Sequence, residues 1–209
     1  MPIGAPGFEY QLFLARMSYS KYILWQGHYT EGDPRLFGVH FGFSPLLGWS
    51  IGANALYQYG GGDRPAAFTT LLSSLFHRTA LTSTGTDSRF ANRSISITSA
   101  YVFPGATPVR TYLEYAARDT FHGELYRFHE TALSAGVHIP QLLQRFDLTL
   151  ELSEWQNGWF TDYVWLSGMT EAGDVVGGWG GDWREFSNAA GAFSGMAQLG
   201  FTLDSGDLV

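Results

Sequence analysis

The sequence contains no cysteine, few charged residues and no long hydrophobic run. Without cysteine, the chain has no disulfide framework and no thiolate site for zinc or redox chemistry. Charged residues make up 15% of the chain, below the roughly 25% that is usual for a soluble domain. The net charge of −7 argues against nucleic acid as a partner, because phosphate binding depends on basic side chains. No run of about 18 apolar residues exists, which excludes a helical membrane protein.

Glycine and aromatic residues are abundant instead. The chain has 26 Gly, 16 Phe, 11 Tyr and 7 Trp in 209 residues. This composition points away from an ordinary helical enzyme and away from disorder. The length fits one domain or part of a larger one. Residues 1–7 have neither the basic start nor the apolar core of a signal peptide, which leaves a cytosolic protein or a piece of a longer exported one.

Apolar and polar residues alternate with a period of two along most of the chain. In one segment Phe146, Leu148, Leu150 and Leu152 share a face, while the residues between them are polar. The same alternation recurs in residues 37–44, 49–59, 95–103, 109–118, 133–139 and 193–203, and more weakly in 8–17 and 21–29. These segments have about the ten residues that a tilted strand needs to cross a bilayer. Turn residues separate them, which predicts an antiparallel up-and-down sheet.

Several of the apolar faces end in aromatic residues, among them Trp49, Tyr57, Tyr59, Tyr101 and Phe103. Aromatic girdles at both ends of lipid-facing strands are typical of outer-membrane barrels, whose interior faces are polar. We therefore predict an all-β fold: an antiparallel up-and-down outer-membrane β-barrel, partial, with about nine or ten strands and one short inserted helix. A soluble β-sandwich or jelly roll has the same alternation and stays open as the alternative at this point.

One segment breaks the period of two. Between Pro65 and Phe76, the apolar residues Phe68, Leu71, Leu72, Leu75 and Phe76 follow the spacing of an amphipathic helix, with Pro in its first turn. We expect this helix to plug the interior of the barrel or to pack at its rim, rather than to act as a membrane anchor.

The longest irregular stretch runs from Gly168 to Asn188 and combines many glycines with Trp179 and Trp183. Glycine beside exposed tryptophan is the composition of a surface that stacks on sugar rings. A loop that is packed by its own tryptophans has the same composition, so both interpretations stay open.

Two stretches resemble a known family. They are Gly-Gly-Gly-Asp-Arg-Pro at 60–65 and Val-Val-Gly-Gly-Trp-Gly-Gly-Asp at 175–182. With the surrounding strand pattern, from about residue 36 to 203, they are similar to the capsule assembly Wzi family. The resemblance implies an outer-membrane β-barrel that helps to attach or organise capsular polysaccharide at the cell surface. The family-motif positions in this chain are Gly61, Gly62, Asp63, Arg64, Pro65, Gly177 and Asp182.

The chain departs from the family in two ways. Gly178 stands where the family pattern has a histidine, and the chain is too short for a whole family barrel. We expect residues 1–209 to form a single Wzi-like barrel segment, a C-terminal portion that is incomplete at both ends. The complete barrel is expected to be monomeric and embedded in outer-membrane lipid.

The sequence shows no catalytic or metal-binding motif. Neither His-Glu-x-x-His nor Gly-x-Ser-x-Gly occurs. The densest titratable cluster consists of His122, Glu124, His129 and Glu130, and it is better explained as a polar hairpin loop. Carboxylates that a glycosidase would use in pairs occur at Glu114, Asp119, Glu151 and Glu154. They are explained more simply as interior charges of a barrel, or as partners of Arg110 and Arg118. We expect no enzyme activity, no cofactor and no metal.

The resulting functional hypothesis is a non-catalytic outer-membrane protein that attaches or assembles capsular or other surface polysaccharide. The candidate sugar contacts are Arg64, Trp179, Trp183 and Arg184, because arginine offers forked donors and tryptophan a flat apolar face. A diffusion porin and an outer-membrane barrel hydrolase are the alternatives. Channel conductance, polysaccharide binding and ester or glycosidic turnover distinguish the three.

Overall fold

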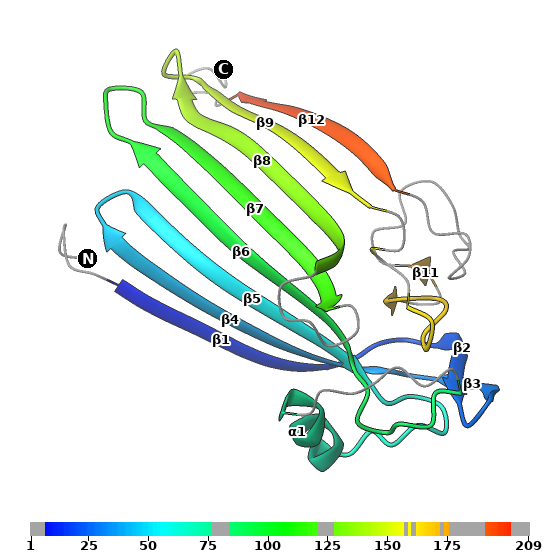
Figure 1. Ribbon diagram of the computed structural model, residues 1–209. Coiled ribbons are helices and arrows are strands. Elements are labelled where there is room, and N and C mark those ends of the chain that lie inside the picture. The colour runs from blue at the N-terminus through cyan, green and yellow to red at the C-terminus, as the bar shows by residue number, and fades with distance from the viewer. Residues whose placement is uncertain are drawn as a thin grey trace, which may run out of the picture.

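A single antiparallel sheet of eight strands dominates the structure, a computed structural model that describes residues 7–76, 84–120, 128–156, 159, 162–171, 174–175 and 191–201. The strands follow one another in the order β1-β4-β5-β6-β7-β8-β9-β12, and the sheet is curved (Figure 1). Their bounds are β1 (Gly7–Arg16), β4 (Arg35–Leu46), β5 (Trp49–Tyr59), β6 (Asn92–Phe103), β7 (Val109–Thr120), β8 (Phe128–Leu142), β9 (Phe146–Trp155) and β12 (Ala192–Phe201). In the described part of the chain β1 and β12 are the edges, so the barrel is partial, as predicted.

The remaining elements are short and lie outside this sheet. A hairpin of β2 (Ser20–Trp25) and β3 (His28–Gly32) replaces the single strand predicted for 21–29, because the chain turns at Gln26 and Gly27 with positive φ angles. A second hairpin consists of β10 (Thr170–Glu171) and β11 (Asp174–Val175). Helix α1 (Phe68–Phe76) follows β5. Among the described residues no helix has the length and apolar character needed to cross a membrane.

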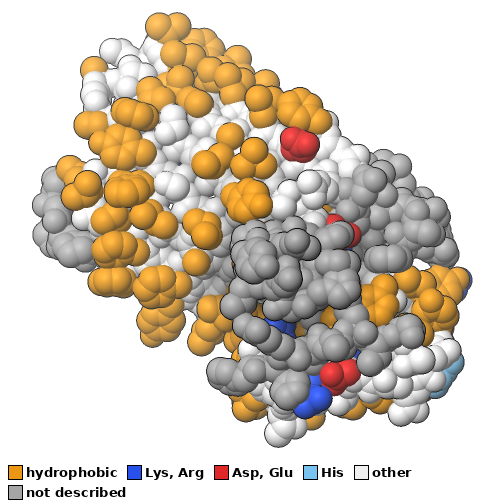
Figure 2. Space-filling view, in the orientation of Figure 1, with side chains coloured by type: hydrophobic (Ala, Val, Ile, Leu, Met, Phe, Trp, Pro, Cys, Tyr) orange, Lys and Arg blue, Asp and Glu red, His pale blue; other side chains and the backbone are white. Residues whose placement is uncertain are grey.

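The register of the eight strands separates apolar from polar residues across the whole sheet. We call the apolar side the outer face; one of its rows contains Tyr10, Phe41, Ala53, Ile97, Tyr115 and Leu133. We call the polar side the inner face; one of its rows contains Gln11, His40, Asn54, Ser96 and Ala116. Figure 2 shows mostly hydrophobic side chains over the sheet, with very few charges.

The outer face has no second sheet packed on it within the described residues. Leu150 and Leu152 are 46% and 57% exposed, while Glu151 between them bonds to Tyr112 on the inner face. A soluble sandwich would bury these leucines between two sheets. The faces predicted for the segment 146–152 are therefore confirmed, and the sandwich alternative is wrong.

The connections between strands differ strongly at the two ends of the sheet. One end has the short connections 47–48, 104–108 and 143–145. The other end, which we call the long-connection end, has 17–34, 60–91, 121–127 and 156–191. The β2–β3 hairpin, α1 and the β10–β11 hairpin all belong to the long-connection end (Figure 1).

Helix α1 begins at Phe68, and Pro65 lies ahead of its first turn, in which Ala67 accepts the amide hydrogens of Thr70 and Leu71. The helix therefore begins at Phe68 and not at Pro65, where the sequence predicted its start. Leu71 is buried against Tyr59 and Ala91 at the long-connection end. The helix packs at the rim, and the alternative of an interior plug is not what the structure shows.

Candidate functional site

A row of polar side chains crosses the inner face near β1. His40 Nδ1 lies 2.6 Å from Asn54 Oδ1, and the Asn54 amide donates to Ser96 Oγ at 2.8 Å. His40 Nε2 lies 3.0 Å from a carboxylate oxygen of Glu9. The three interactions join β1, β4, β5 and β6 through side chains, so the polar groups are held in place before any ligand arrives.

A second polar link crosses the inner face over a glycine. The register places Tyr112 beside Gly136 and Gly136 beside Glu151. The Tyr112 hydroxyl donates to the Glu151 carboxylate at 2.7 Å, and Ser153 Oγ donates to the same carboxylate at 3.1 Å. A Cβ at position 136 would lie 2.3 Å from the Tyr112 ring, so only glycine lets the ring cross β8.

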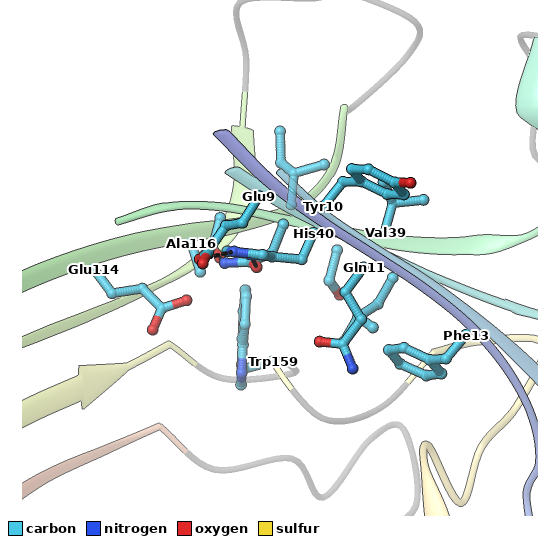
Figure 3. Close-up of a pocket in the computed structure, with 14 residues that line it drawn as sticks. Glu9, Tyr10, Gln11, Phe13, Val39, His40, Glu114, Ala116 and Trp159 are labelled. Atoms are coloured by element: carbon cyan, nitrogen blue, oxygen red, sulfur yellow. Dashed lines mark hydrogen bonds and ion pairs between the residues drawn. The ribbon is translucent and has the colours of Figure 1, made fainter. Parts of the chain in front are cut away.

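A cavity of about 730 Å³ lies over the inner face (Figure 3). Side chains from β1, β4, β5, β6 and β7 line one side, and Trp159, which follows β9, stands opposite them. Glu9, His40 and Glu114 point toward the Trp159 indole in this view. The volume is typical of small-ligand sites, which measure roughly 300–1,000 Å³.

The lining of this cavity matches a hydroxyl-rich ligand. Carboxylate, amide and hydroxyl groups accept and donate hydrogen bonds, while the indole offers a flat apolar face and one N–H donor. The described lining contains the carboxylates Glu9 and Glu114 and no arginine or lysine. A neutral sugar therefore fits it better than an anionic one, because like charges repel in a partly desolvated site.

Of the carboxylates predicted as candidates for a hydrolase, Glu114 lines the cavity together with Glu9, whereas Glu151 and Glu154 lie on β9 outside its lining. Glu151 is held by Tyr112 and Ser153 on the inner face, whereas Glu154 lies on the outer face beside Leu133 and Phe193. The Asp119 side chain lies outside what the structure describes. Glu130, from the predicted His and Glu cluster, is paired with Arg118, and 121–127 lie outside the described residues. Over the described chain, no three His, Asp or Glu side chains gather as metal ligands would.

The glycine-rich motif at 60–65 forms a tight turn around a buried arginine. Gly60, Gly61 and Gly62 all have positive φ, at 63°, 92° and 57°. Arg64 is 3% exposed, and its guanidinium donates to the carbonyl oxygens of Leu24, Gly85 and Asp87 at 3.1, 2.7 and 2.8 Å. It also lies 5.1 and 5.3 Å from the ring centres of Trp25 and Trp165.

This environment gives Arg64 a structural role. Burial lowers the pKa of the Arg64 guanidinium, although the group stays charged at neutral pH because arginine starts so high. The buried guanidinium is not available to a sugar at the surface, so the prediction of a polysaccharide contact at Arg64 is not supported. Asp63 and Pro65, its neighbours in the motif, are exposed at the turn.

A second buried arginine holds the inner face at the long-connection end. Arg118 donates to Asn92 Oδ1 at 3.0 Å and to Asp162 Oδ2 at 2.9 Å, and it is ion-paired with Glu130. Gln58 on β5 donates to the Gly168 carbonyl at 2.9 Å. These bonds fasten residues 162–168 onto the inner face, so this segment fills part of the interior.

Residues 162–168 also pack against the β2–β3 hairpin. Ile23, Phe90, Val164 and Trp165 form a buried apolar cluster, and the Trp165 indole donates to the Gly60 carbonyl at 3.0 Å. The sequence pattern missed Trp159, Trp165 and this cluster, since short irregular segments carry no periodic signal.

The other predicted contacts are not placed by the structure. Trp179, Trp183 and Arg184, with the motif positions Gly177 and Asp182, lie outside the described residues. Of the predicted sugar contacts only Arg64 can be located. The cavity around Trp159 is therefore the candidate site that the structure itself defines.

These features define the class of the protein. An antiparallel sheet with an exposed apolar outer face, a polar inner face and long connections at one end is part of an outer-membrane β-barrel. The family model described as "Capsule assembly protein Wzi" matches residues 7–206, and the chain belongs to this family. Membership implies a role in capsule assembly at the outer membrane. Comparison with curated proteins and with solved structures gives no match.

Proposed function

We propose that this chain forms part of a non-catalytic outer-membrane barrel that holds capsular polysaccharide at the cell surface. The observation that carries the proposal is the cavity on the inner face, where Trp159 stands opposite an ordered row of hydrogen-bonding side chains. One or two sugar rings fill such a volume, with the indole against the ring and the polar row against its hydroxyls.

The orientation of the sheet supports a surface role. Outer-membrane barrels have short periplasmic turns and longer extracellular loops, so the long-connection end faces outward. The stretch Gly168–Asn188 then lies on the capsule side. We keep Trp179, Trp183 and Arg184 as proposed polysaccharide contacts, since aromatic stacking and forked donors suit acidic or neutral sugars. Weak contacts at several points retain a long polymer through multivalency.

The eight strands form one arc of a larger barrel in this proposal. The edges β1 and β12 would leave unpaired backbone groups in lipid, which is very costly. Further strands on either side would remove this cost, and a closed barrel of that kind needs no second copy of the chain.

The two alternatives have less support. A diffusion porin needs an open interior, whereas residues 162–168 lie across the inner face. A hydrolase needs a nucleophile, a base and donors for the developing charge, and the described inner face does not bring such a set together.

Capsule retention tests the proposal directly. Trp159→Ala, and separately the double variant Trp179→Ala and Trp183→Ala, should lower cell-bound capsule and raise shed capsule several-fold. Heat-modifiable gel migration reports barrel assembly in the same cells. Trp49→Phe is the matched control, because Trp49 lies on the outer face at the opposite end of the sheet and bonds to Ser99.

The outcomes separate the parts of the proposal. Normal retention in both variants, with normal assembly, contradicts polysaccharide attachment through these tryptophans. Loss only in the double variant limits the contact to Trp179 and Trp183. Loss only in Trp159→Ala limits it to the cavity.

A further inference from the structure

Helix α1 packs on the outer face of the sheet. Its residue Leu75 contacts the apolar cluster formed by Tyr59, Leu71 and Ala91, and so do Phe37 and Tyr57. The register places Phe37, Tyr57 and Arg93 in one row of the outer face, two rows from Phe41, Ala53 and Ile97. Figure 1 shows α1 beside the long-connection end of β4 and β5.

A hydrogen bond fixes the helix in this position. The Arg93 guanidinium donates to the Ser74 carbonyl, and it lies 5.9 Å from the centre of the Tyr57 ring. Because Arg93 and Tyr57 are outer-face residues, α1 lies on the side of the sheet that the barrel turns toward lipid. It does not lie over the interior.

Among the side chains of α1 that the structure describes, four apolar ones lie along one side, and only two of them contact the sheet. Leu71 and Leu75 face the sheet, whereas Phe68 and Leu72, one helical turn apart, are 58% and 42% exposed. The helix contains no charged residue, and its polar side chains are threonine and serine, of which Thr69 is exposed and Ser74 is buried. In water, an exposed helix of this kind would leave two large apolar side chains uncovered.

We infer that α1 is an interfacial membrane helix, whose Phe68 and Leu72 insert into the lipid leaflet at the long-connection end. The apolar outer face is continuous with the row on which α1 packs, so the surface that covers the sheet also reaches the helix. Amphipathic helices with one apolar side and one polar side lie in the boundary between headgroups and acyl chains. The helix then marks the level of the membrane surface on the barrel.

Spin labels test this position, since the chain has no native cysteine that would also react. Nitroxides are attached to single variants, Leu72→Cys and its neighbour Ser73→Cys, in protein reconstituted into phosphatidylethanolamine and phosphatidylglycerol liposomes. Accessibility to oxygen, which enriches in lipid, is compared with accessibility to a water-soluble nickel chelate. The oxygen-to-nickel ratio should be several-fold higher at 72 than at 73. Phe68→Cys and Thr69→Cys form a second pair with the same expectation, should either member of the first pair fail to assemble.

A label at Ile97→Cys, on the outer face of β6, separates this inference from the membrane placement of the sheet. A low ratio at 97 would contradict the barrel itself. A high ratio at 97 with equal ratios at 72 and 73 would overturn only the role of α1. A label at 72 that is shielded from both oxygen and nickel, and that shows dipolar broadening from a second label, would mean that another copy of the chain covers the helix. That result would also overturn the inference.

Discussion

Single side chains hold the long-connection end together. Arg64 reaches three carbonyl oxygens that are distant in sequence, at Leu24, Gly85 and Asp87. Its planar guanidinium also contacts the rings of Trp25 and Trp165. A lysine ammonium has neither the fork nor the flat face, so the position needs arginine. Packing therefore explains the arginine of the Gly-Gly-Gly-Asp-Arg-Pro motif.

Loss of the Arg64 guanidinium should destabilise the protein. Arg64→Lys and Arg64→Ala should each lower the free energy of unfolding by about 2–4 kcal/mol, because buried carbonyls lose charged donors. Urea unfolding in detergent measures this loss. Arg89→Ala is the control, because Arg89 is exposed and its pair with Asp87 is worth about 0–1 kcal/mol. Equal effects at the two positions would contradict the structural role of Arg64.

The raised pKa of the partly buried Tyr163 hydroxyl predicts that the protein loses stability at alkaline pH. Burial, reinforced by the Asp162 carboxylate, raises the pKa of Tyr163 above its ordinary value of 10.0. Above about pH 10 the unfolded chain releases a proton that the folded chain keeps, so stability is full below that pH and falls as pH rises. Urea midpoints measured on both sides of pH 10 should drop less for Tyr163→Phe than for the unchanged protein. An equal drop of the urea midpoint in the variant and in the unchanged protein would show that Tyr163 does not contribute to the loss of stability at high pH.

The elements differ in how well the sequence predicts them. The strands of the sheet were predictable because each has one apolar and one polar side, and the period of two is strict. The hairpin at β2–β3 was missed because its turn, Gln26-Gly27, lies inside an apolar stretch and only Gly27 is a common turn residue.

The candidate site was less predictable, for a physical reason. The cavity depends on the register of five strands and on where Trp159 folds back, and neither is encoded in local spacing. Arg64 was visible in its motif, but its burial results from carbonyls on two other segments. Whether the Arg64 side chain is exposed or buried therefore could not be inferred from the motif alone.

The two faces of β9 predict opposite responses to a charge. Leu150→Arg should cost about 2–4 kcal/mol of barrel stability, since it places a charge near the middle of the lipid-facing band. Thr149→Arg, one residue earlier on the inner face, should be tolerated. Urea unfolding in lipid vesicles compares the two variants. A reversed order of the two costs would contradict the assignment of the faces.

At the scale of the whole molecule, the interior is obstructed at its long-connection end. Arg118 connects β6, β8 and residue 162, and Gln58 holds residue 168. The segment between them lies against the inner face and joins it to the β2–β3 hairpin through Trp165. Diffusion of solutes needs an open interior, so these contacts argue against a porin.

Channel recordings distinguish an obstructed interior from an open one. The assembled barrel should conduct poorly in a planar bilayer, and Arg118→Met should raise its conductance. That change removes both ion pairs of Arg118, with Asp162 and with Glu130, and breaking a buried ion pair is strongly destabilising, so residues 162–168 should leave the inner face. Arg110→Met is the matched control, because Arg110 lies near the start of the same strand and contacts the Tyr112 ring. High conductance in the unchanged protein would favour the porin alternative, since it would show that residues 162–168 do not close the interior. Unchanged low conductance in Arg118→Met would show that contacts other than the Arg118 ion pairs hold the segment in place.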